Sequence, residues 1–195
     1  MTNIVMLGGN GYIGRAIIQD WLAIDQNATF YIYSRSGKNK LQHPHIKNYA
    51  VTIQDYQKLK PLLPDQIDYV IDLVGRPEKN IDNLKQINEI PAKMMLKIAG
   101  DYHVKGMGFI QGSLGPKSFV AIKKDIATML IESGVKTAIV NPTLVYGQDR
   151  SDTLAKFVPL FKFLGLFSKN MRPVTVGKVA TEMISKLRND SEVKR

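Results

Sequence analysis

The chain has 195 residues, of which 44% are hydrophobic, and this length and composition fit one globular domain with a sizeable core. It contains no cysteine, which excludes disulfides, thiolate catalysis and cysteine-based zinc sites, and its three histidines have no carboxylate cluster nearby, so we expect no metal. The net charge of +10 favours anionic partners, although the basic residues are spread along the chain as on an ordinary solvated surface.

The predicted elements alternate between strands and helices. Short apolar runs rich in β-branched residues, such as 4–7, indicate buried parallel strands. Ile13, Ile17, Trp21 and Ile24 share one face of a helix. In chain order we expect strands at 4–7, 29–33, 49–53, 69–74, 107–111 and 136–140, and helices at 13–24, 56–63, 81–99 (kinked or restarted at Pro91), 119–133, 153–163 and 176–187.

This alternation predicts an α/β fold: a Rossmann-type doubly wound parallel sheet in a three-layer α/β/α arrangement. We expect one NAD(P)-binding domain over 1–195, in which 148–195 form a small helical extension rather than a separate substrate domain. The N-terminus shows no secretory signal, and the apolar stretch 157–167 is shorter than the about 20 residues that a spanning helix needs. A cytoplasmic location is therefore expected.

The most informative segment follows the first predicted strand. Its glycines permit a tight turn, let a pyrophosphate approach the backbone and let the helix pack against the strand. The N–H groups at the helix N-terminus would face the phosphates. The predicted cofactor-binding turn comprises Gly8, Gly9, Asn10, Gly11, Tyr12, Ile13 and Gly14.

The second predicted strand ends at Ser34 and Arg35, with Lys38 close behind, where an NAD-binding chain is expected to carry a carboxylate for the ribose 2′-OH. A guanidinium offers a charge-assisted fork to a 2′-phosphate, so the sequence favours NADP(H) over NAD(H). An arginine at this place can also stack on adenine in NAD-binding proteins, which leaves NAD(H) open.

Several segments resemble the short-chain dehydrogenase/reductase superfamily, in its extended and atypical branches (NmrA-like or NAD-dependent epimerase-like). MLGGNGYIGRAI is similar to the nucleotide turn, DYVIDLVG to the fourth strand, FIQGS to the fifth, and NPTLVYG and RPVTVGKVA to later segments. The resemblance implies that Val74 and Gly75 lie against the cofactor. The chain looks like a truncated single-domain member, because extended members add a substrate domain.

The catalytic pattern departs from that family, whose Tyr-x-x-x-Lys passes a proton and holds the nicotinamide ribose. Here Phe119 stands in place of the tyrosine and cannot exchange a proton, while Ser113 and Lys123 match. Tyr146, in a segment that lies near the substrate in the family, is the stand-in we expect, with Tyr102 as the other tyrosine at a strand end. The predicted catalytic residues are thus Ser113, Lys123 and Tyr146, and Lys123 would also bind the cofactor.

Two functions follow from this pattern. The first is a small NADPH-dependent oxidoreductase that passes hydride to a flat acceptor such as a flavin or quinone, since solvent can supply the proton. The second is a cofactor-binding protein without turnover, similar to the NmrA-like redox sensors or to the nucleotide-binding accessory subunit of respiratory complex I. The phenylalanine-rich stretch around Phe157, Leu160, Phe161, Phe163 and Phe167 would suit an acceptor site, a homodimer face or contact with a membrane surface. No motif indicates specific nucleic-acid binding.

Overall fold

A parallel sheet forms the centre of the protein, as seen in a computed structural model that describes residues 1–147 and 173–188. The strands are β1 (Asn3–Leu7), β2 (Thr29–Ser34), β3 (Ile46–Ala50), β4 (Tyr69–Asp72), β5 (Gly106–Ile110) and β6 (Thr137–Val140). They form one six-stranded sheet in the order β3-β2-β1-β4-β5-β6, and every pair is parallel. The order reverses between β1 and β4, which is where a doubly wound sheet opens a crevice at its carboxyl edge.

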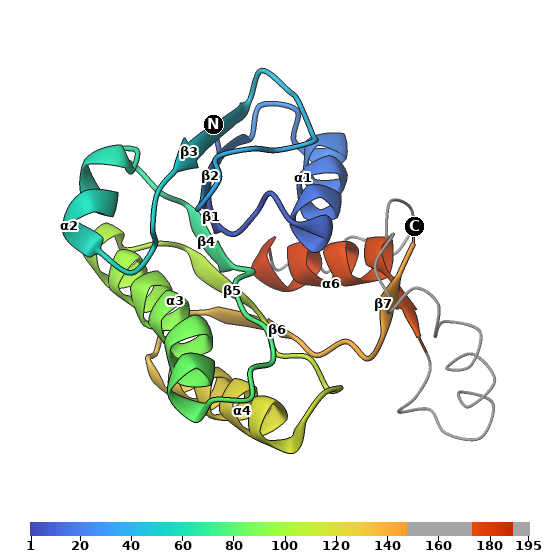
Figure 1. Cartoon of the computed structure of the whole chain (residues 1–195). Coiled ribbons are helices and arrows are strands. Elements are labelled where there is room, and N and C mark those ends of the chain that lie inside the picture. The colour runs from blue at the N-terminus through green and yellow to red at the C-terminus, as the bar shows by residue number, and fades with distance from the viewer. Residues whose placement is uncertain (148–172, 189–195) are drawn as a thin grey trace.

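Helices cover both faces of this sheet (Figure 1). Helices α1 (Tyr12–Ile24) and α6 (Val176–Arg188) pack on one face, and α3 (Ile81–Tyr102) and α4 (Lys117–Glu132) pack on the other. The short α2 (Tyr56–Leu59) and the 3-10 turn η1 (Lys60–Leu62) connect β3 to β4. Asp55 and Asn80 begin α2 and α3, because their side-chain oxygens accept hydrogen bonds from the first free N–H groups of each helix.

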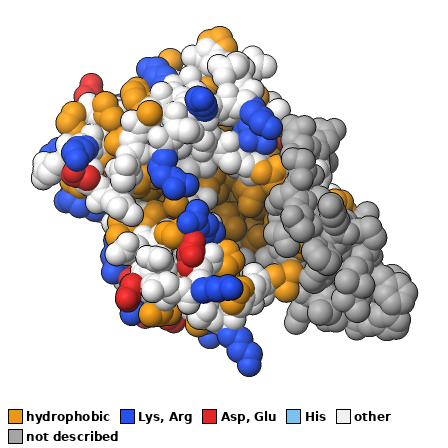
Figure 2. Space-filling model, in the orientation of Figure 1, with side chains coloured by type: hydrophobic (Ala, Val, Ile, Leu, Met, Phe, Trp, Pro, Cys, Tyr) orange, Lys and Arg blue, Asp and Glu red, His pale blue; other side chains and the backbone are white. Residues whose placement is uncertain are grey.

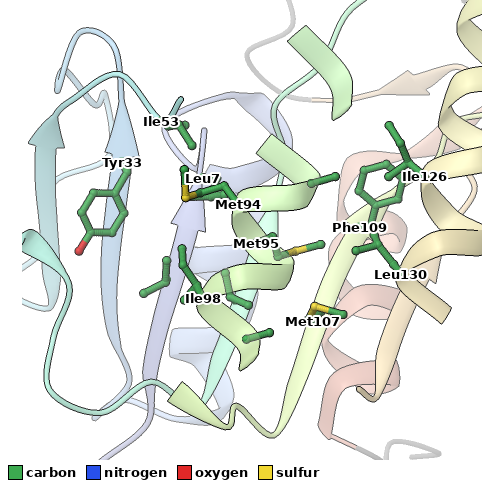
Figure 3. Packing of buried hydrophobic residues seen from close by; sticks show 14 of the residues in the cluster. Leu7, Tyr33, Ile53, Met94, Met95, Ile98, Met107, Phe109, Ile126 and Leu130 are labelled. Carbon is green, nitrogen blue, oxygen red and sulfur yellow. The ribbon is translucent and has the colours of Figure 1, made fainter. Parts of the chain in front are cut away.

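Each face of the sheet has its own hydrophobic core. Figure 3 shows the core under α3 and α4, where Met94, Met95 and Ile98 of α3 meet Leu7 of β1 and Met107 of β5. The second core lies under α1 and α6 and includes the buried Trp21, which packs edge-on against Phe30. Burial on both faces explains why the central strands have continuous apolar sequences rather than alternating ones.

The structure confirms the predicted fold class and the order of elements within the described residues. The third strand was predicted at 49–53 but is Ile46–Ala50. It is an edge strand in which no residue is fully buried and Lys47 and Ala50 are exposed, so its sequence lacks the apolar run that marks a central strand. Ile53 is buried beyond its end. Helix α3 continues through Pro91 and does not restart there.

A two-residue parallel pair was not predicted: β7 (Val145–Tyr146) pairs with β8 (Val174–Thr175). Strands this short carry no periodic signal in the sequence. The helix predicted at 153–163 and the phenylalanine-rich stretch lie outside the described residues. None of the helices in the described ranges combines the length and apolar character that crossing a bilayer requires.

Candidate functional site

The glycine turn joins the end of β1 to the start of α1, at the point where the strand order reverses. The backbone N–H of Gly8 donates to Tyr33 O at 2.9 Å, and that of Gly11 donates to Gly8 O at 3.2 Å, which folds the turn tightly. A Cβ on Gly14 would lie 2.2 Å from the carbonyl oxygen of Gly9, so α1 approaches the turn as closely as it does only because residue 14 is glycine. Helix α1 begins after Gly11, and no side chain caps it. Its first N–H groups are therefore available to an anion.

A cleft runs along this edge of the sheet in two connected halves of about 870 and 610 Å³, which share Gly8, Val74 and Gly75. Figure 2 shows a hollow with a hydrophobic floor and basic side chains at its rim. The larger half is lined by the turn and by the loops after β4, β5 and β6. Its apolar walls include Ile110, Leu114, Pro116, Phe119, Pro142 and Leu144.

The smaller half lies beside the end of β2. Asn10, Ser34 and Arg35 line it, and Arg76, from the loop after β4, lines it too. Ser34 Oγ accepts a hydrogen bond from Gly37 N at 3.2 Å, and Asn10 Nδ2 donates to Lys38 O at 2.9 Å, which fixes this loop against the glycine turn. The side chain of Lys38 does not line either half of the cleft as the described residues define it.

Two opposite charges are buried at the floor of the larger half. Asp72, the last residue of β4, is 1% exposed, and Lys123 of α4 is 5% exposed. Burial raises the pKa of Asp72 to about 7, against the opposing effect of the Lys123 charge, and burial lowers the pKa of Lys123 to about 8, against that of Asp72. The Lys123 ammonium also lies 3.9 Å from the centre of the Phe109 ring.

The backbone beside this pair makes room for polar atoms. Gly75 has a φ of +144°, and a Cβ there would lie 2.5 Å from Asn88 Oδ1 and 3.3 Å from Lys123 Nζ. Asn88 Nδ2 donates to Leu84 O at 2.8 Å and to Arg76 O at 3.0 Å, which directs its oxygen towards Gly75. The amide oxygen and the ammonium therefore both lie beside Gly75, although no hydrogen bond joins them.

The predicted site residues separate into two groups. Gly8, Gly11, Tyr12, Ile13, Gly14, Val74, Gly75 and Lys123 line the larger half, and Asn10, Ser34 and Arg35 line the smaller half. Gly9 lines neither, because its α-carbon lies against Met6, where a Cβ would come within 2.7 Å. Phe119 lines the larger half, one helical turn before Lys123, at the place of the family tyrosine.

Ser113, Tyr146 and Tyr102 are absent from the residues described as lining the cleft. Ser113 Oγ donates to Pro142 O at 3.1 Å, so its hydroxyl is engaged with the backbone of a neighbouring loop. Tyr146 lies in β7, and Tyr102 lies at the carboxyl end of α3. The structure thus brings most of the predicted cofactor-binding residues and Lys123 together along the cleft, but not Gly9, Lys38 or the other two predicted catalytic residues.

Sequence reasoning missed Asp72, Asn88 and Arg76. Asp72 carried a signal, because an acidic residue closes an otherwise apolar buried strand and such a charge needs a reason to be there. Asn88 and Arg76 carried none, since a helical asparagine and a loop arginine are ordinary surface residues.

A dinucleotide fits what this chain presents. An uncapped helix N-terminus faces one half of the cleft, arginines line the other half, and the cleft spans the reversal of strand order. The apolar walls of the larger half suit a flat ring.

Comparisons with known proteins agree with this geometry. The chain is similar in structure to the Bordetella bronchiseptica enzyme WbmH in complex with NAD+, at 16% identity and a TM-score of 0.75, covering 96% of this chain and 72% of that one. It is similar to ElxO with NADP bound, at 17% identity and a TM-score of 0.70, covering 100% and 94%. It is also similar to the UDP-Glc/GlcNAc 4-epimerase from Campylobacter jejuni, at 13% identity and a TM-score of 0.73, covering 98% and 76%. These identities show a shared fold alone.

Curated protein sequences gave no match. The model of the NAD dependent epimerase/dehydratase family matches residues 4–113, more than half of the chain. The match takes in the glycine turn, β2, β4 and Ser113, and it ends before Phe119 and Lys123. The chain belongs to the NAD dependent epimerase/dehydratase family.

Proposed function

We propose that this protein binds NADP(H) in the cleft and acts as a small oxidoreductase on a flat acceptor such as a flavin or quinone. The observation that carries the proposal is the lining of the cleft: Arg35 stands beside the smaller half, and Phe119 stands in the larger half where the family has its tyrosine. Similar structures that hold NAD+ and NADP support a nicotinamide cofactor.

The charge of the smaller half favours a cofactor with a 2′-phosphate. Arg35 and Arg76 both line the smaller half, whereas no acidic side chain lines it in the described residues. Glu78 accepts a hydrogen bond from Arg76 Nε at 2.8 Å, so part of the Arg76 charge is already neutralised. Arg35 is therefore the group that we expect to discriminate between the two cofactors.

A reduced nicotinamide bound in the larger half would supply a hydride. The residues of the chain would do the rest: Lys123 would hold the ribose hydroxyls, and the apolar walls would exclude water and let a planar acceptor stack. Phe119 supplies surface for stacking but no proton, which suits an acceptor that takes its proton from solvent. Reduction of a sugar carbonyl would need the missing hydroxyl.

One observation favours the second function, a cofactor-binding sensor or assembly component without turnover. Ser113, the family's other hydroxyl, is bonded to Pro142 O instead of lining the cleft. A measurement of NADPH oxidation in the presence of FMN, FAD or a soluble quinone distinguishes the oxidoreductase from the sensor. Turnover that Arg35→Asp weakens supports the oxidoreductase, whereas tight binding with no turnover on any acceptor supports the sensor.

A further inference from the structure

Five apolar side chains line the larger half of the cleft from two neighbouring segments. Leu114, Pro116 and Phe119 come from the segment that joins β5 to α4 and from the first turn of α4, and Pro142 and Leu144 come from the loop after β6. We call these five side chains the apolar end. Apolar walls of this kind bind the faces of a flat ring by removing its surface from water.

Contacts within and between the two segments hold the apolar end in shape. Ser113 donates both its backbone N–H and its hydroxyl to Pro142 O, at 3.0 and 3.1 Å, which ties the segment after β5 to the loop after β6. The ring of Phe119 lies against Gly115, whose φ is +143° and where a Cβ would come within 2.9 Å of that ring. The Phe119 ring therefore has a place that only a residue without a side chain leaves open.

The charged residues of the larger half are directed elsewhere. Among the described residues that line it, only Arg15, Asp72 and Lys123 carry charge. Arg15 Nη1 donates to Asn10 O at 3.0 Å, in the glycine turn, and Asp72 and Lys123 are buried at the floor, 1% and 5% exposed. An anionic group on an acceptor at the apolar end would thus leave water without gaining a cation from these lining residues, which is costly.

We propose that the acceptor bound at the apolar end is an uncharged quinone of one or two rings, and not a phosphorylated flavin. The inference rests on the proposed function and deepens it, because it names the acceptor class. NADPH, which the proposed function supplies, is oxidised to NADP+, and its hydride reduces the quinone to a hydroquinone anion. A proton from solvent then completes the hydroquinone.

This acceptor also suits the phenylalanine at position 119. Hydride addition to a quinone leaves the negative charge on a phenolate oxygen, whose pKa is close to that of tyrosine, about 10. Hydride addition to an isolated carbonyl leaves an alkoxide, a much stronger base that needs a proton donor in the site. Phe119 provides a ring face and no proton, so it matches the acceptor whose charge solvent can neutralise afterwards.

The test compares acceptors that differ in charge. NADPH oxidation by the full chain is measured with 1,4-naphthoquinone and its 2-sulfonate, and with riboflavin and FMN, after subtraction of the uncatalysed rate. We expect kcat/KM to be about tenfold or more higher for each neutral acceptor than for its anionic counterpart, and highest for 1,4-naphthoquinone. The sulfonate makes the ring a stronger oxidant, so intrinsic reactivity works against this result. The chain has no cysteine, so the quinones have no thiol to alkylate.

Leu114→Lys places a cation at the apolar end, at a partly exposed position that can accept a longer side chain. It should lower the preference for naphthoquinone over its sulfonate severalfold, whereas the neutral control Leu114→Gln should keep that preference. Lys117→Met removes an exposed cation near the apolar end that does not line the cleft, and it should change no acceptor. An unchanged preference in Leu114→Lys, or a loss of FMN turnover in Lys117→Met, overturns the inference.

Binding measured without turnover separates this inference from the proposed function. Saturation-transfer NMR of each naphthoquinone is recorded with the protein saturated with NADP+, which cannot reduce them. If the neutral compound binds more tightly than its sulfonate, the inference holds even where no acceptor oxidises NADPH and the oxidoreductase function fails. If the two bind equally, if the sulfonate binds more tightly or if neither binds, the inference fails, and turnover with FMN would leave the oxidoreductase function standing.

Discussion

Gly11 and Gly14 make different demands on the same turn, and replacing each by alanine separates folding from binding. At Gly14 the new methyl would lie 2.2 Å from Gly9 O and 2.6 Å from its carbonyl carbon. Both are backbone atoms, so the turn and α1 must move apart. Overpacking of this kind costs about 1–3 kcal/mol, and better helix propensity returns about 1 kcal/mol. Because the clash is with backbone atoms, we take the upper end of the overpacking range and expect a net loss of about 2 kcal/mol, which lowers Tm by about 4–8 °C in a chain of this size.

At Gly11 the fold has room for a methyl group. The nearest atom to the new Cβ is Gly8 O at 3.4 Å, an ordinary contact, and the φ of −72° suits alanine. The free energy of unfolding should change by less than about 1 kcal/mol. The methyl would nevertheless project where the pyrophosphate must approach the backbone, so affinity for NADPH should fall at least tenfold.

The assay is thermal unfolding by circular dichroism together with NADPH titration of the wild type and both variants. Gly11→Ala should keep its Tm and lose its ligand, whereas Gly14→Ala should lose stability. If Gly11→Ala binds NADPH as tightly as the wild type, the dinucleotide does not lie on this turn. If Gly14→Ala unfolds at the same Tm as the wild type, α1 does not pack on the turn as closely as the structure shows.

The remaining predictions concern the smaller half, the missing tyrosine and the buried carboxyl. Arg35→Asp should weaken NADPH binding at least tenfold and NADH binding only slightly, measured by nicotinamide fluorescence; equal losses would refute the 2′-phosphate role. Phe119→Tyr should leave flavin reduction with NADPH within a fewfold of wild type, and a large gain would mean that proton transfer limits the rate. Burial raises the pKa of Asp72 from 3.8 to about 7, so the stability that its protonated form contributes is complete below the unfolded value and is lost as pH rises through about 7. The fall in the urea midpoint from pH 5 to pH 8 should therefore be smaller in Asp72→Asn than in the wild type or in Asp125→Asn, and parallel curves would contradict the burial argument.

The sheet could be predicted from the sequence because its central strands are buried on both faces. Runs such as Ile4–Leu7 can be recognised as continuous apolar segments. The glycine turn can be recognised because a pyrophosphate and the following helix approach the backbone only where side chains are absent. The edge strand β3 and the pair β7–β8 could not be located, since half-exposed or two-residue strands leave no periodic pattern.

The residues of the site likewise fall into those that the sequence could predict and those that it could not. Residues near one another in sequence, such as Gly8 to Gly14, were found together because one turn holds them. The buried polar residues of the larger half come from different elements: Asp72 of β4 and Lys123 of α4 line it, and Asn88 of α3 lies with Lys123 beside Gly75. Only the fold brings them near one another. Loop geometry also decides whether a hydroxyl lines the cleft. Ser113 Oγ, for example, donates a hydrogen bond to Pro142 O instead.

The most direct test of the central claim is equilibrium titration of the purified wild type with NADPH and, separately, with NADH, followed by nicotinamide fluorescence. We predict saturable binding of both, with NADPH bound at least severalfold more tightly, because Arg35 lines the smaller half, where the proposed site would hold the 2′-phosphate. If neither cofactor binds at accessible concentrations, the cleft is not a dinucleotide site. If NADH binds more tightly than NADPH, the role given to Arg35 is wrong.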